Sequence, residues 1–320
     1  MNENVKYLER YLAGEYEKVW DELFSLDREI RQEEFYDDAP AVVYETMRRV
    51  HKNIEMLIER LFQIGFVFGY DHCIQRSLEK LDTAEARRSY LESLSWVYHQ
   101  PPVFLSANQI EEEEAEEEAM IRTLFSPITD DELKELQHNF RRVTKVHEDQ
   151  FPSMGSYINE IEQLIGPVPL SIRAWYEVVG GVNFSGFHAE WQKHAYSSWP
   201  EDLATTVRPT LIYACDPLQI YPLDSVFMTR LRQKHMPGEK FLFEFAPDRS
   251  FKDNYGGAGT PYAFFLPDMR ADAWLVDLSR TFVQYLRMSI LQWAGFPGMA
   301  EWRTAPEEDL AFLIHDLLPF

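Results

Sequence analysis

The chain has 320 residues, enough for about two domains of the usual ~100 to 200 residues each. Apolar residues make up 45% of it and charged residues 26%, which excludes a largely disordered chain. Its formal net charge of −22 repels a phosphate backbone, and no basic stripe offsets this charge, so we expect no nucleic-acid partner.

The first third of the chain is predicted to be a helical domain over residues 1–110. Apolar residues recur at three- and four-residue intervals in Val5–Arg31 and again in Val43–Leu61. A capping box at 82–85 predicts a further helix. The short apolar run at 66–70 fits either a strand or a buried turn, because so short a run has no diagnostic period.

An acidic linker is predicted over residues 111–127. Residues 111–118 comprise seven glutamates and one alanine, a block that repels itself and has nothing to bury. A solvated helix that continues to Leu124 is the alternative, because Glu and Ala favour helix once solvent screens the repulsion. The same block could also dock a basic partner.

Residues 156–187 predict a helix, a turn, a second helix and a strand. The first helix ends at Gly166–Pro167, because Gly tolerates left-handed dihedrals and Pro cannot continue the hydrogen-bond ladder. Pro169 opens the second helix, whose apolar side includes Trp175. Gly180–Gly181 then ends it before the strand.

This stretch reads I-x-x-I-E-x-x-I-G-x-x-P-L-S-x-R-A-W-Y-E-V-V-G-G-V-N, and it resembles the signature of the SMI1/KNR4 superfamily, also called SUKH. DPLQIYPL at 216–223, FLFEFAPD at 241–248 and GTPYAFFLPD at 259–268 extend the resemblance, which covers roughly residues 128–291. Many members of the family are immunity proteins that neutralise toxin nucleases or deaminases, and fungal members regulate cell-wall assembly. The resemblance therefore implies a protein-binding module.

Residues 128–320 are predicted to form an α+β domain, with a mixed, mainly antiparallel sheet flanked by helices. A capping box at 129–132 opens the domain, and another at 304–307 starts a terminal helix after a helical stripe at 282–293. Helices before and after a run of strands are typical of this class. The predicted strands are Thr210–Cys215, Leu218–Leu223, Phe241–Ala246, Tyr262–Leu266 and Trp274–Leu278.

We expect a cytoplasmic protein without a membrane span or signal peptide. No segment approaches ~18 uninterrupted apolar residues, and the first twenty residues carry charges throughout. Cys73 and Cys215 lack metal-ligand spacing, so we interpret both as reduced and mostly buried.

Few residues form a recognisable chemical motif. His188, Glu190 and His194 lie close together, but two metal-binding His residues on one helix face are four apart, and these are six apart. The glycines at 256–259 precede no Lys-Ser/Thr pair, so they do not predict a phosphate loop. We therefore expect no metal, no cofactor and no catalysis.

The candidate residues for partner binding are aromatic and acidic residues in predicted loops. Aromatic anchors dominate binding hot spots, and charges at the rim steer association. Core packing or loop capping would explain each of them equally well. These candidates are Glu190, Trp191, Trp199, Asp248, Asp253 and Tyr255.

Our first functional hypothesis is a non-enzymatic, toxin-neutralising or regulatory adaptor, and a basic protein surface suits its acidic charge. The alternative is that the acidic charge only keeps the protein soluble. The alternative is a small-molecule or enzymatic site between the two domains that uses His188, Glu190, Asp248 or Asp253. A third possibility is self-association of the helical domain.

Overall fold

The structure is a computed structural model that describes residues 6–32, 38–68, 154–184, 186–188, 191, 215–252, 259–301 and 304–320. The predicted linker at 111–127 and the capping boxes at 82–85 and 129–132 lie outside these residues. No helix in the described ranges has the length and apolar character needed to cross a bilayer.

The N-terminal helices confirm the predicted helical region, but the run predicted from 5 to 31 is divided. It forms α1 (Tyr7–Leu12), α2 (Tyr16–Ser25) and the 3-10 helix η1 (Asp27–Arg31). Gly14 separates α1 from α2 with a φ of 104°, a left-handed conformation that ends a helix. The long helix α3 (Asp38–Gln63) follows, and its apolar stripe is fully buried at Val43, Val50 and Leu57.

The predicted unit of two helices and a strand is present in the centre of the chain. It consists of α8 (Met154–Leu164), α9 (Leu170–Val178) and β2 (Val182–Asn183). Gly166 ends the first helix with a φ of 117°. Trp175 is fully buried, and its ring meets that of Phe282 edge-on, with centroids 5.4 Å apart. This contact ties α9 to a helix more than a hundred residues later.

The strands form short antiparallel ladders, which confirms the α+β class. The strands are β1 (Val67–Phe68), β2, β3 (Gly186–Phe187), β4 (Gln219–Ile220), β5 (Phe241–Ala246), β6 (Tyr262–Leu266), β7 (Trp274–Leu275) and β8 (Arg280–Thr281). The pairs are β1–β3, β2–β4, β5–β6 and β7–β8. Single backbone hydrogen bonds connect β4 to β5 (Tyr221 N to Phe245 O, 2.8 Å) and β6 to β7 (Val276 N to Ala263 O, 3.0 Å).

Further helices follow in the second half of the chain. They are α12 (Ser225–Lys234), α13 (Arg249–Lys252), α14 (Phe282–Leu286), the π-helix η5 (Arg287–Gln292), the 3-10 helix η6 (Pro297–Ala300) and α15 (Glu307–Ile314). The capping box predicted at 304–307 does not form: Pro306 is the N-cap of α15. The Thr304 hydroxyl instead contacts Cys215 Sγ at 3.0 Å.

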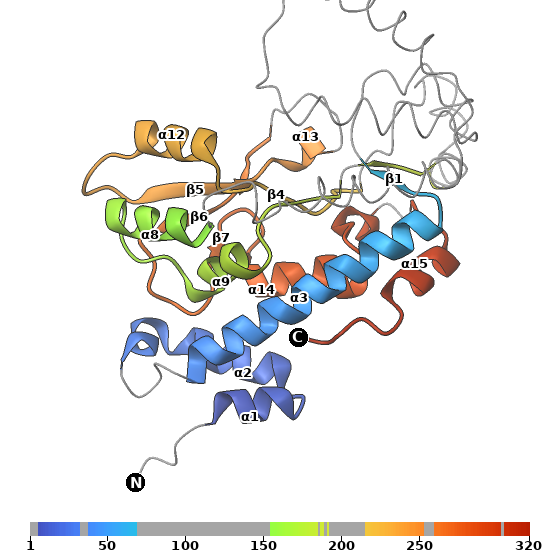
Figure 1. Cartoon of the computed structure of the whole chain (residues 1–320), viewed down its shortest axis with the longest axis horizontal. Coiled ribbons are helices and arrows are strands. Elements are labelled where there is room, and N and C mark those ends of the chain that lie inside the picture. Colours follow the sequence, from blue (N-terminus) through green and yellow to red (C-terminus); the bar gives the residue numbers. More distant parts are fainter. Residues whose placement is uncertain are drawn as a thin grey trace, which may run out of the picture.

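The buried apolar side chains form one continuous core that extends from Tyr7 to Phe320. Helix α3 contacts α1, α9, α15 and η5, and Figure 1 shows α3 between the α1–α2 pair and the helices that underlie the sheet. The N-terminal helices therefore share their core with the α+β part of the chain.

Candidate functional site

Of the six residues predicted to bind a partner, the structure describes Trp191 and Asp248, and it buries both. Trp191 exposes none of its surface, and its Nε1 donates to Asp309 Oδ2 at 2.7 Å. Asp248 is 9% exposed and lies against Gly259. Neither side chain forms part of an exposed surface. For these two residues the structure therefore shows core packing and not a binding surface. Glu190, Trp199, Asp253 and Tyr255 lie outside the described residues.

His188, one of the residues named for the alternative site, is held by structural hydrogen bonds. Its Nδ1 accepts the N–H of Trp191 at 3.2 Å, and its Nε2 lies 2.7 Å from the carbonyl oxygen of Ile64. These bonds assign a neutral ring with the proton on Nε2. Both ring nitrogens are thus occupied. The described ranges also contain no group of three or more His, Cys, Asp or Glu residues placed to hold a metal ion.

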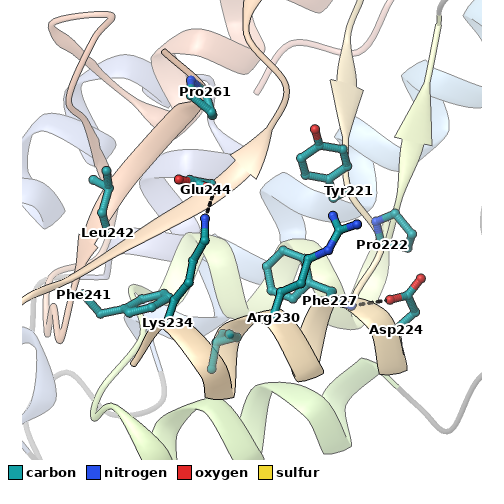
Figure 2. Close-up of a pocket in the computed structure, with 11 residues that line it drawn as sticks. Tyr221, Pro222, Asp224, Phe227, Arg230, Lys234, Phe241, Leu242, Glu244 and Pro261 are labelled. Carbon is teal, nitrogen blue, oxygen red and sulfur yellow. Dashed lines mark hydrogen bonds and ion pairs between the residues drawn. The ribbon is translucent and has the colours of Figure 1, made fainter. Parts of the chain in front are cut away.

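A pocket of about 230 Å³ lies between α12 and β5, and we call it the α12 pocket (Figure 2). Six of its lining residues are apolar or Pro, and five are polar or charged. Such a mixture is typical of small binding sites, in which a few polar groups orient an apolar ligand. The lining residues are Tyr221, Pro222, Asp224, Phe227, Arg230, Leu231, Lys234, Phe241, Leu242, Glu244 and Pro261.

Helix α12, which forms one wall of the pocket, was not predicted from the sequence, although its N-cap residue and its apolar spacing could have indicated it. Asp224 is the N-cap of α12, and its Oδ1 accepts the N–H of Phe227 at 2.7 Å. Phe227 and Leu231 are four residues apart and so share one face. Arg232 and Lys234 lie in the last turn, where cations interact favourably with the helix dipole.

The charged groups of the α12 pocket differ in whether they are already engaged. Asp224 caps the helix, and Lys234 Nζ lies 2.8 Å from Glu244 Oε2. Arg230 forms no ion pair with any carboxylate in the described part of the chain, and its side chain extends from α12 toward Tyr221 (Figure 2). Burial raises the pKa of Tyr221 to about 12, so its hydroxyl remains a donor at neutral pH.

A row of exposed apolar side chains adjoins the pocket. Leu242 of β5 pairs with Phe265 of β6, and these residues are 37% and 45% exposed. Val276 N donates to Ala263 O at 3.0 Å, so β7 lies beside β6, and the ring centre of Trp274 in β7 lies 6.3 Å from that of Phe24 in α2. Trp274 is 41% exposed. Leu242, Phe265 and Trp274 thus form an apolar row across three strands, and Leu242 also lines the pocket.

A second charged cluster lies in the interior. Lys252 Nζ contacts Asp216 Oδ1 at 3.0 Å, and the Tyr262 hydroxyl donates to Asp216 Oδ2 at 2.8 Å. The ammonium group also lies 4.1 Å from the centre of the Tyr262 ring. Burial by itself would lower the pKa of Lys252, but Tyr285 and Asp216 together raise it by more. The net pKa of Lys252 is therefore raised, and the ion pair persists. A protonated, paired lysine is not a nucleophile, so this cluster stabilises the fold.

Comparison of the chain with family models, with curated proteins and with solved structures gives no match in any of the three. The SMI1/KNR4 resemblance therefore rests on the sequence motifs quoted above.

Proposed function

We propose that this protein is a non-enzymatic module that binds another protein through the apolar row. The observation that carries the proposal is that Leu242, Phe265 and Trp274, each more than a third exposed, lie on three neighbouring strands. Contiguous apolar side chains on the surface of a soluble protein are typical of interaction sites, whereas single exposed apolar side chains are common on any protein surface. The SMI1/KNR4 resemblance of residues 128–291 supports the same class of function.

The partner is a folded protein with an apolar patch and a basic surface around it. The chain has a net charge of −22, which attracts a cationic surface and raises its rate of association. The family resemblance implies a toxin or a regulated enzyme, and a toxin gene beside the gene for this protein would favour the first. A cytoplasmic location also belongs to this proposal.

The test uses a photo-crosslinking amino acid in the full chain, placed at Phe265 or, as control, at Phe312. Phe312 is 42% exposed, close to the 45% of Phe265, but it lies on α15, away from the row. We expect one protein adduct from position 265 and none from position 312. Equal labelling at both positions, or none at 265 in cells of the source organism, would contradict the proposal.

The identified partner then permits a quantitative test. Phe265→Ser is expected to weaken its binding by at least about tenfold, because a buried aromatic anchor contributes more than ~1.4 kcal/mol. Phe312→Ser should leave the affinity unchanged. Affinity that does not respond to Phe265→Ser would remove the apolar row from the interface.

A further inference from the structure

The α12 pocket provides two hydrogen-bond donors beside an apolar surface. Arg230 has no carboxylate partner within the described ranges, whereas Lys234 and Asp224 are engaged by Glu244 and by the Phe227 amide. Tyr221 retains its proton because burial raises its pKa to about 12. The Arg230 guanidinium offers only donors, so it selects an anion, and the Tyr221 hydroxyl can supply one further donor.

The charge of this region differs from that of the rest of the chain. Residues 221–244 contain four Lys or Arg and three Asp or Glu, in a chain whose net charge is −22. Two of the three acids, Asp224 and Glu244, already accept hydrogen bonds from Phe227 and Lys234. The charges that line the pocket balance, with Arg230 and Lys234 against Asp224 and Glu244. Because Lys234 is paired with Glu244, Arg230 is the cation in the lining that can meet an incoming carboxylate.

The apolar lining decides what kind of anion fits. Phe227, Leu231, Phe241 and Leu242 surround the pocket, and a volume of about 230 Å³ is comparable with one or two side chains. A bare inorganic anion would leave these surfaces uncovered. The adjoining apolar row continues from Leu242, so an occupant of the pocket can extend over the sheet. These features together suit a chain segment better than an isolated small molecule.

We infer that the α12 pocket binds a partner segment in which a large apolar residue is followed by Asp or Glu. The apolar side chain occupies the pocket among Phe227, Leu231 and Phe241, and the carboxylate accepts hydrogen bonds from Arg230 and Tyr221. This inference rests on the proposed function, since it names the chemistry with which the partner is anchored. The acidic remainder of the surface contacts the basic surface around that anchor.

The experiment measures the fluorescence anisotropy of labelled synthetic peptides that are titrated with the full chain. The probe has a central Leu-Glu pair in a Gly-Ser background and an amidated end. Matched peptides contain Leu-Gln or Ser-Glu, and a fourth ends in Leu with a free carboxylate. We expect Leu-Glu to bind more tightly than each of the other three. No binding of Leu-Glu up to about 1 mM would overturn the inference.

Variants of the protein identify the anion-binding group. Arg230→Gln is expected to weaken binding of the Leu-Glu peptide by about tenfold, because a charge-assisted hydrogen bond is lost. The Leu-Glu peptide should then bind no more tightly than the Leu-Gln peptide. Arg230→Lys should restore part of that advantage, since it retains the charge but not the planar fork. Arg232→Gln is the matched control: it removes the same charge from α12, but Arg232 pairs with Glu160 and does not line the pocket.

Several outcomes contradict the inference. Equal loss of binding in the Arg230→Gln and Arg232→Gln variants would indicate a general charge effect, and tightest binding of the peptide with a free carboxylate would assign the pocket to chain ends. The failure of this inference can be distinguished from the failure of the proposed function. If Arg230→Gln leaves the adduct at position 265 unchanged while the peptides fail to bind, the apolar row remains the interface without this anchor.

Discussion

At the scale of single residues, Lys252 and Asp216 form a buried ion pair. Removal of one partner leaves a buried charge uncompensated, which typically costs about 3–5 kcal/mol. We expect Asp216→Asn to lower the free energy of unfolding by this order, as measured by urea denaturation. Asn tolerates the φ of 46° at this position, so the loss reports the charge and not the backbone.

The control for this prediction is a double-mutant cycle. Lys252→Met combined with Asp216→Asn should cost less than the sum of the single variants by about 1–3 kcal/mol, because the two side chains interact directly. Lys6→Met removes a cation whose pair with Glu9 lies at the exposed surface, and it should leave the free energy of unfolding unchanged within error. Strict additivity within the buried pair would disprove the coupling.

Asp272 makes stability depend on pH. Its Oδ1 and Oδ2 accept the N–H groups of Ala273 at 2.9 Å and Val283 at 3.1 Å, and Arg270 and Arg287 are the charged groups that face it. Burial raises the pKa of Asp272 to about 6, although hydrogen bonds from its neighbours oppose this shift. Between pH ~4 and about 6, the folded state therefore holds this proton more tightly than the unfolded chain.

It follows that the contribution of Asp272 to stability rises as the pH falls through this window. From pH 7.5 to pH 5, the wild-type free energy of unfolding should gain on the order of 1 kcal/mol relative to Asp272→Asn, which cannot titrate. Chemical denaturation of both proteins at the two pH values measures this difference. A constant difference would mean that Asp272 stays ionised in the folded state.

At the scale of elements, α3 holds the segment 313–320 through polar side chains. Asn53 is buried, its Nδ2 donates to Leu318 O, and its Oδ1 accepts Leu318 N–H, both at 2.8 Å. Arg60 Nη1 donates to Leu313 O at 2.7 Å, and Arg49 Nη1 to Pro319 O at 2.9 Å. These bonds satisfy backbone groups of a segment that follows the end of α15.

Replacement of Asn53 with Ala is expected to lower the free energy of unfolding by about 2–4 kcal/mol, because two backbone groups of Leu318 lose their partners. Amide hydrogen exchange at 315–320 should become faster. Arg48→Ala, on the exposed side of the same helix, is the control and should leave this exchange unchanged. Unaltered protection in the Asn53 variant would mean that the arginine hydrogen bonds and the apolar contacts of Phe320 suffice to hold the segment.

Helix ends show why local signals succeed at some elements and fail at others. Asp38 is the first residue of α3, yet its carboxylate accepts the N–H groups of Tyr7 and Leu8 at the start of α1. Conversely, Thr281 and Gln284 form a capping box that the sequence analysis did not identify. A capping side chain can satisfy any nearby amide, and tertiary contacts decide which one is near.

At the scale of the whole molecule, the shared core joins segments from both ends of the chain. Helix α3 packs on α9, and Arg31 donates to Val168 O at 2.7 Å and to Met269 O at 3.2 Å. These contacts link the N-terminal helices to the α+β part. The sequence analysis predicted separate domains on composition and on the acidic linker at 111–127, which lies outside the described residues. Composition reports where a chain is polar, but it does not report which apolar faces meet.

The sequence by itself determined the α+β class, helices α3, α8 and α9, and strands β5 and β6, because periodicity and turn residues are local properties. Only the tertiary structure decided that Leu242, Phe265 and Trp274 lie on neighbouring strands, that Arg230 borders a pocket, and that Trp191 is buried. Each of these depends on which distant segments come together, and that is set by the packing of the whole core.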